Sequence, residues 1–257
     1  MNKISGAFKN KKVFIAYIMA GDPSLEKTAE FILSAQRAGA GLVEIGVPFS
    51  DPVAEGEVIQ RASMRALKNK INLDKIFDMI LSLNGKINIP LVLMTYLNPV
   101  FVYGYEKFFE RCAACGASGV IIPDMPFEES DEVRPYAEKN GVDVITLVSP
   151  SSSDERIKAI AGAARGFIYL VSSYGVTGVR SKISTDISAI IKKIKQYTRA
   201  PVAVGFGISK PEQAAEFAKC ADGVIVGSAI VKIIEEHGAS AAPHIEKYIK
   251  GMAAALN

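Results

Sequence analysis

Residues 42–60 read LVEIGVPFSDPVAEGEVIQ and pass from a short apolar run, through a loop with prolines and glycine, into a helical pattern. Leu42, Val43 and Ile45 predict a buried strand that contains one acid, Glu44. A buried carboxylate is costly unless it is paired, protonated or used in chemistry. Because Glu55 follows on the loop, both carboxylates can face one cavity and act there as acid and base. A structural role for Glu44, tied to backbone amides or a lysine, is the alternative.

The same strand–loop–helix unit recurs along the whole chain. Apolar runs of strand type, each followed by a helical pattern, occupy residues 13–18, 42–45, 89–94, 119–122, 142–148, 167–171, 202–204 and 223–226. Such continuous apolar runs are typical of parallel strands that are covered on both faces. Eight units fit a closed (β/α)8 TIM barrel better than an open sheet of five or six strands. We therefore predict one α/β barrel domain over residues 1–257, with a short N-terminal helix within residues 2–9 that caps the barrel bottom.

Two prolines carry local structural signals. Asp22-Pro23 predicts a helix that begins with an Asp cap and Pro at its first position. Asn98-Pro99 is a turn signal.

Composition excludes several classes of protein. The 257 residues carry a net charge of +3, from 30 basic and 27 acidic side chains that are interspersed. This pattern indicates neither a nucleic-acid partner nor a membrane surface. No signal-peptide core is present and no apolar run reaches the roughly 18 residues of a spanning helix, so we expect a cytoplasmic protein.

Cysteine and histidine give no sign of a metal or redox centre. Cys112 and Cys115 lie inside a helical pattern, on one apolar face, and no second pair completes a zinc site. The only histidines, His237 and His244, both lie in the C-terminal helical region. We expect packed core thiols and no bound metal.

Glycines at the ends of the last strands predict a phosphate site. Gly205-Phe206-Gly207 follows the seventh apolar run, and Gly227-Ser228 follows the eighth and opens a helix. Glycine lets the backbone approach a ligand closely, and amides at a helix N-terminus favour an anion. Loops after strands seven and eight are the usual phosphate site of a TIM barrel.

The chemistry that fits such a site is narrow. No lysine lies on a predicted strand, which disfavours a Schiff-base aldolase, and no histidine cluster supports a metal aldolase. Carbon–carbon cleavage would then need a substrate with its own electron sink. An indole ring protonated at C3 can serve, with two carboxylates moving the protons.

Several motifs together resemble the tryptophan synthase alpha subunit family. They run in order from the first strand to the last helix: Ala20-Gly21-Asp22-Pro23, Glu44-Ile45-Gly46-Val47-Pro48-Phe49-Ser50-Asp51-Pro52, Leu93-Met94-Thr95-Tyr96, Pro123-Asp124-Met125-Pro126, Gly175-Val176-Thr177-Gly178, Gly205-Phe206-Gly207-Ile208-Ser209 and Gly227-Ser228-Ala229-Ile230-Val231. The resemblance implies retro-aldol cleavage of indole-3-glycerol phosphate to indole and glyceraldehyde 3-phosphate.

The resemblance also implies residue roles. Glu44 would be the acid/base at indole C3 and the glycerol hydroxyl, Glu55 would accept the indole N–H, and Tyr169 would support the site. The substrate-binding residues implied or predicted by these motifs are Tyr17, Ile59, Leu93, Thr177, Gly178, Gly205, Phe206, Gly207, Gly227 and Ser228. Tyr96 is interpreted as ordinary barrel packing. Residues 173–182 carry flexible glycines and are expected to close over the site as a lid.

A partner follows from the same resemblance. The family uses no cofactor of its own and binds a beta subunit that carries pyridoxal phosphate, so we expect an alpha2beta2 complex. The partner would dock over the loops after strands two and three, which include Asp51, Pro52, Asn98 and Pro99.

One position departs from the family pattern. The family usually reads Asp-Gly-Pro where this chain reads Glu55-Gly56-Glu57, so the carboxylate sits one methylene further out. A displacement of about 1 Å in a reacting group can cost roughly 10²-fold in rate. Two alternatives therefore stay open: another phosphate-binding barrel, such as an isomerase or epimerase, and a mainly regulatory alpha-like subunit with weak activity.

Overall fold

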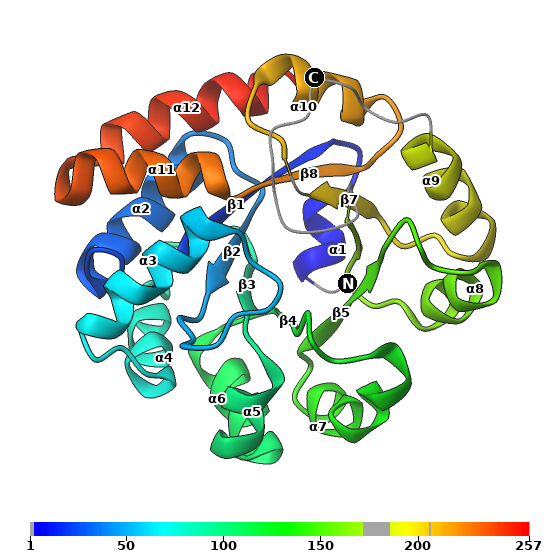
Figure 1. The fold of residues 1–257 in the computed structure, drawn as a ribbon, viewed down its shortest axis with the longest axis horizontal. Coiled ribbons are helices and arrows are strands. Elements are labelled where there is room, and N and C mark those ends of the chain that lie inside the picture. Colours follow the sequence, from blue (N-terminus) through cyan, green and yellow to red (C-terminus); the bar gives the residue numbers. More distant parts are fainter. Residues whose placement is uncertain (1–2, 172–185, 206, 257) are drawn as a thin grey trace.

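Eight parallel strands close into a barrel in the order of the sequence, as predicted (Figure 1). The computed structural model describes residues 3–171, 186–205 and 207–256. The strands are β1 (Val13–Met19), β2 (Leu42–Gly46), β3 (Leu91–Met94), β4 (Gly119–Ile121), β5 (Asp143–Val148), β6 (Ile168–Val171), β7 (Val202–Gly205) and β8 (Gly223–Val226). The barrel closes where β8 pairs with β1. The prediction of a TIM barrel is confirmed.

Helices surround this barrel as an outer ring (Figure 1). They are α2 (Leu25–Arg37), α3 (Glu57–Lys68), α4 (Leu73–Leu81), α5 (Leu97–Tyr103), α6 (Tyr105–Cys115), α7 (Arg134–Lys139), α8 (Asp154–Ala163), α9 (Asp186–Tyr197), α10 (Pro211–Ala218), α11 (Ser228–His237) and α12 (Ala242–Ala254), with 3-10 turns η1 (Phe127–Glu132) and η2 (Gly238–Ser240). None of these described helices is long and apolar enough to cross a membrane.

Two apolar clusters hold the layers together. Side chains alternate along each strand, so that on β2 Leu42 belongs to the cluster inside the barrel, while Val43 and Ile45 belong to the cluster under the helices. Each large side chain that is fully buried contributes roughly 1.5–3 kcal/mol. The strands are therefore apolar on both faces, and a polar residue at an inward position stands out.

The N-terminal helix α1 (Lys3–Ala7) caps the barrel bottom, as predicted. Ile4 is fully buried and belongs to the inner cluster, together with Phe8 and Phe167. A Cβ on Gly119, the first residue of β4, would lie 2.9 Å from Ile4 Cδ1. The glycine therefore leaves room for the plug, and in Figure 1 α1 lies across the barrel inside the ring of helices.

One predicted helix start is wrong, and one predicted turn is part of a helix. Helix α2 is capped by Ser24, whose hydroxyl accepts the Lys27 N–H at 3.2 Å, and it begins at Leu25 rather than after Asp22. The Asp22 carboxylate is instead held by a side chain of α3. The turn expected at Asn98-Pro99 is the first turn of α5, where proline is tolerated because the first N–H groups of a helix have no intrahelical acceptor.

Candidate active site

The carboxyl ends of the strands surround a cavity of about 380 Å³, which is large enough for a small substrate. Most of its wall is apolar, with a few polar side chains that converge on it. The described residues that line it are Tyr17, Glu44, Ala54, Glu55, Gly56, Val58, Ile59, Met94, Tyr169, Gly207, Ile208, Ser209, Ile225, Gly227, Ser228, Ala229 and Lys232. Such apolar walls with sparse polar groups are typical of a binding site.

Glu44 enters this cavity from the middle of β2. It points inward because it lies two residues after Leu42 and therefore on the same face of the strand, and its Cα pairs with that of Tyr17 on β1. The side chain is 1% exposed, and its Oε2 atom has no hydrogen-bond partner among the described residues. Burial, and then the charge of Glu55, raise the pKa of Glu44 to about 8. Glu44 is therefore protonated at neutral pH and can donate a proton.

Glu55 reaches the same cavity from the loop between β2 and α3. It is 5% exposed, and the Gln60 amide donates to its backbone carbonyl at 2.8 Å, which ties the loop to the first turn of α3. Burial raises the pKa of the Glu55 carboxyl, and a hydrogen bond from Tyr96 opposes that rise. One cavity thus holds two carboxyl groups with perturbed pKa values, which is the arrangement that acid/base chemistry requires.

Tyr96 does not line the cavity, but it does more than pack in the barrel, because its hydroxyl contacts the loop that carries Glu55. Its hydroxyl accepts the Ala54 N–H at 3.0 Å and hydrogen-bonds the Glu55 carboxylate. The ring packs against Phe49, with centroids 5.1 Å apart. The hydroxyl of a buried tyrosine needs a hydrogen-bond partner. This general rule was the one sign in the sequence that Tyr96 makes a polar contact.

Tyr17 and Tyr169 project into the barrel from β1 and β6. Burial raises the pKa of both phenols, and the charge of Glu44 raises each further. Glycines give the rings their space, because a Cβ on Gly46 would lie 2.1 Å from the Tyr17 hydroxyl and one on Gly205 would lie 2.4 Å from that of Tyr169. Gly205, expected to contact substrate, is absent from the cavity lining described above and makes room for Tyr169.

The predicted phosphate end lies at the start of α11. Gly207 has φ +77°, a conformation that favours glycine, and it lines the cavity with Gly227 and Ser228. Lys232 is the only cationic side chain among the described residues of the lining, and no motif in the sequence singled it out. Thr177, Gly178, Phe206 and the expected lid at residues 173–182 lie outside the described residues.

Strand parity corrects one of the predicted substrate-binding residues, Leu93. Leu93 packs in the cluster outside the barrel, whereas its neighbours Val92 and Met94 face inward. Met94 accordingly lines the cavity, and so does Ile59. Glu44 pairs with Val92, which lies on the same face of β3 as Met94, so the inward position of Glu44 could have identified Met94 only if the register between β2 and β3 were known.

Metal ligands do not gather in the described part of the chain. It contains no group of three or more His, Cys, Asp or Glu residues that could hold an ion. Cys112 and Cys115 are buried, and burial raises the pKa of both thiols, as expected for packed core cysteines.

Comparisons with known proteins point to one family. The family model described as "Tryptophan synthase alpha chain" matches residues 5–256. The tryptophan synthase alpha chain of Lacticaseibacillus casei is 46% identical over 257 residues, which covers 100% of this chain and 96% of the relative. That of Methanocaldococcus jannaschii is 47% identical over 230 residues, which covers 89% of this chain and 82% of the relative.

Solved structures agree. The crystal structure of the tryptophan synthase alpha chain from Legionella pneumophila superposes with a TM-score of 0.89 at 35% identity, covering 100% of this chain and 97% of that one. A chain of Mycobacterium tuberculosis tryptophan synthase gives 0.90 at 33% identity, covering 99% and 98%. With the family model, the relatives and the folds in agreement over the whole length, this chain belongs to the tryptophan synthase alpha chain family.

Proposed function

We propose that this chain cleaves indole-3-glycerol phosphate to indole and glyceraldehyde 3-phosphate, with Glu44 and Glu55 as its working carboxyl groups. The observation that carries the proposal is their convergence, from a strand and a loop, on one apolar cavity that ends at the α11 N-terminus. Family membership supports the reaction, which is a carbon–carbon lyase reaction.

Glu44 moves the protons in this proposal. Since burial raises the pKa of Glu44 to about 8, the neutral carboxyl protonates C3 of the indole ring. The resulting carboxylate then takes the proton of the hydroxyl on the adjacent side-chain carbon. The bond from C3 to that carbon breaks, its electron pair restores the aromatic indole, and the hydroxyl becomes the aldehyde. One proton is given and one is regained, so the step balances.

Glu55 stabilises the cation that exists between these steps. Protonation at C3 leaves positive charge on the ring nitrogen, whose N–H would donate to the Glu55 carboxylate. The Tyr96 hydroxyl holds that carboxylate and favours its ionised form. Glu44 and Glu55 therefore carry opposite tasks, neutral acid and ionised acceptor. Tyr169, beside Glu44, supports the site.

The phosphate would bind at the other end of the cavity. The amides of Gly207, Gly227 and Ser228 would donate to it, since these residues line the cavity, and the α11 dipole favours an anion there. The proposal keeps Gly178, Phe206 and Thr177 as further contacts on the family resemblance. Lys232, one turn after Ser228, adds a positive charge.

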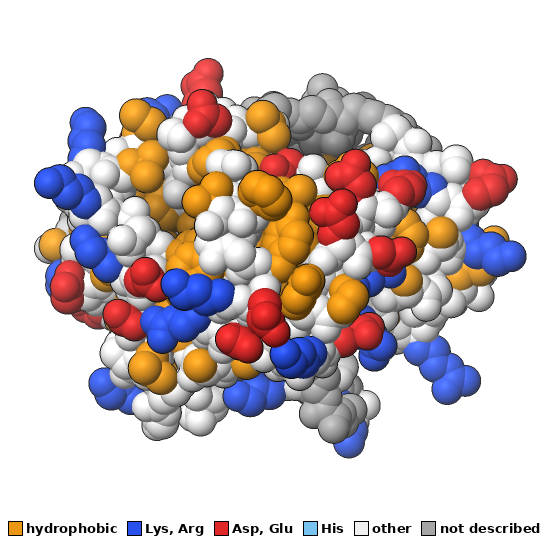
Figure 2. All heavy atoms as spheres, turned by 90° about the horizontal axis from the view of Figure 1, so that it is seen from below, with side chains coloured by type: hydrophobic (Ala, Val, Ile, Leu, Met, Phe, Trp, Pro, Cys, Tyr) orange, Lys and Arg blue, Asp and Glu red, His pale blue; other side chains and the backbone are white. Residues whose placement is uncertain are grey.

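We also propose that the chain needs no cofactor of its own and works with a beta chain that carries pyridoxal phosphate. Three apolar side chains near the loops after β2 and β3 support a docking surface, because Val53 is 72%, Phe101 66% and Val102 75% exposed. Val102 shares a groove with Asn98 and Pro99. In Figure 2 hydrophobic side chains gather in the middle of the face on the side of α5 and α6. Exposed apolar patches of this kind mark interfaces, and an alpha2beta2 assembly is the expected one.

Indole release from indole-3-glycerol phosphate tests the proposal. The purified chain, alone and with a cognate beta chain, should release indole and an aldehyde in equal amounts. Glu55→Ala should nearly abolish release while glycerol 3-phosphate still binds. No turnover in either setting would contradict the proposal, and an isomerase or epimerase would convert its substrate without releasing indole.

A further inference from the structure

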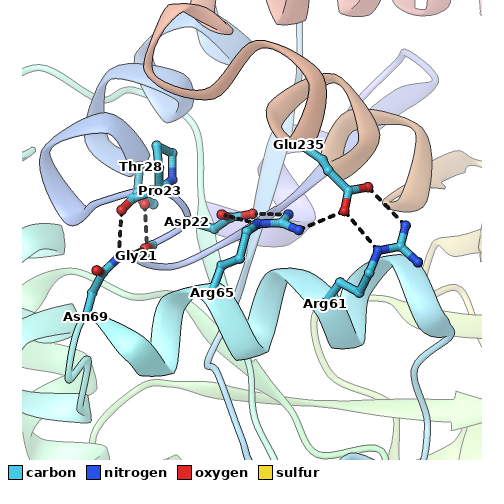
Figure 3. A network of polar contacts seen from close by, with 8 residues as sticks. All are labelled: Gly21, Asp22, Pro23, Thr28, Arg61, Arg65, Asn69 and Glu235. Atoms are coloured by element: carbon cyan, nitrogen blue, oxygen red, sulfur yellow. Dashed lines mark hydrogen bonds and ion pairs between the residues drawn. The ribbon is translucent and has the colours of Figure 1, made fainter.

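A chain of ion pairs joins three elements around the cavity (Figure 3). Arg65 of α3 holds the Asp22 carboxylate of the loop after β1 with two hydrogen bonds, from Nε at 2.9 Å and from Nη2 at 2.8 Å. Its third nitrogen, Nη1, donates to Glu235 of α11 at 2.9 Å. Arg61, one turn earlier on α3, donates to both oxygens of Glu235 at 2.9 and 3.0 Å.

These contacts use one face of α3. Arg61, Arg65 and Asn69 are spaced four residues apart and therefore lie in a row along the helix. The Asn69 amide, just past the helix end, donates to the backbone carbonyls of Gly21 at 3.2 Å and Pro23 at 2.7 Å. The row thus fixes α3 against the loop after β1 and against α11 at once.

The Arg65–Asp22 pair and the Arg61–Glu235 pair differ in how deeply they are buried. The Asp22 side chain is 2% exposed, whereas the side chains of Arg61 and Glu235 are 51% and 30% exposed. Breaking a buried pair leaves an uncompensated charge, while an exposed pair contributes little. The bidentate Arg65–Asp22 contact, with Arg65 32% exposed, is therefore the stronger of the ion pairs that hold α3.

Helix α3 positions the end of the cavity at which Glu55 would accept the indole N–H. The helix begins at Glu57, directly after Glu55 and Gly56, and its Gln60 holds the Glu55 carbonyl at 2.8 Å. Its Ile59 lines the cavity, and so does Ser228 at the start of α11. The pairs to Glu235 thus join the helix next to Glu55 to the helix that begins at the phosphate end. The Arg65–Asp22 pair fixes the same helix to the loop after β1.

We propose that Arg65 is a positioning residue that sets the separation between Glu55 and the phosphate end of the cavity. The inference rests on the proposed function, since it concerns a substrate that must reach both ends. Arg65 itself lines no part of the cavity in the described residues. A misplacement of about 1 Å between the two ends would lower turnover by roughly 10²-fold without weakening either end by itself.

A comparison between ligands that span the cavity and ligands that occupy only one of its ends tests this role. In Arg65→Met, kcat/KM for indole-3-glycerol phosphate should fall roughly 10–100-fold. Affinity for a stable analogue, in which a saturated three-carbon chain links indole to phosphate, should fall with it. Affinities for indole alone and for glycerol 3-phosphate alone should stay within about twofold, because each end keeps its own contacts.

Two further variants keep the test decisive. Arg61→Met removes only the exposed pair and should stay within about twofold of the native chain in every measurement. Asp22→Asn/Arg65→Met leaves no unpaired buried charge, so it should fold and still show the selective loss. Native kcat/KM in either Arg65 variant would overturn the inference, as would an equal loss of affinity for indole alone and for glycerol 3-phosphate alone. Absence of indole release by the native chain would instead contradict the proposed function, and the binding comparison would still report on Arg65.

Discussion

Replacing Glu44 by Gln should change the pH dependence of folding as well as the rate. Burial raises the Glu44 pKa from 4.5 to about 8, so the folded chain binds a proton there that the unfolded chain has released. Stability from the neutral carboxyl is therefore complete below pH 4.5 and is lost as pH rises towards 8. Gln keeps the shape of the neutral form but does not titrate.

The size of the effect follows from the shift. A shift of about 3.5 units corresponds to at most ~5 kcal/mol, of which ~2 kcal/mol falls between pH 5 and pH 7. Relative to the native chain, Glu44→Gln should thus gain about 2 kcal/mol in the free energy of unfolding between these pH values. The value is an upper limit because water that enters the cavity would solvate the carboxylate.

Urea denaturation at pH 5, 6 and 7 measures this difference, with Glu57→Gln as a control on an exposed position of the same region. Indole release by Glu44→Gln should fall by at least ~10³-fold, within the range of a positioned acid/base. Parallel stability curves for the native chain and Glu44→Gln would refute an elevated pKa. Near-native turnover would refute the catalytic role.

Three other changes test other parts of the site. Tyr96→Phe removes the hydrogen bond that lowers the pKa of Glu55, so the acid limb of the pH profile of kcat/KM should move to higher pH and the rate should fall roughly 10-fold. Tyr103→Phe is the control: the Tyr103 hydroxyl bonds Asp74, and its loss should leave the acid limb in place. Lys232→Met removes the cationic side chain of the described lining, and KM should rise several-fold. The rise should be smaller at high salt, where the charge is already screened. An unchanged KM at low salt would contradict a role of Lys232 in phosphate binding. Phe101→Asp places a charge on the exposed apolar surface and should weaken the complex with a beta chain by at least ~10-fold in sedimentation, while indole release by the isolated chain is unchanged.

The sequence alone was enough to predict the barrel architecture and to single out the two acids that share the cavity. Apolar runs that alternate with helical patterns predict parallel strands covered on both faces, and eight of them predict a closed barrel. Glu44 was visible because a charge in an apolar run breaks a local pattern. These signals extend over a few residues, which is the range over which backbone periodicity is set.

Which side chains meet depends on the folded barrel. Leu93 and Met94 are both apolar, and the register of β3 alone places one outside the barrel and the other in the cavity. The hydroxyl of Tyr96 lies against a loop 42 positions away, and Arg65 meets Glu235 across 170 positions. Such contacts depend on barrel closure, since closure fixes strand order and register together and brings distant loops to one rim. The spacing of residues along the chain carries no record of that geometry, and so the site's supporting contacts came from the fold.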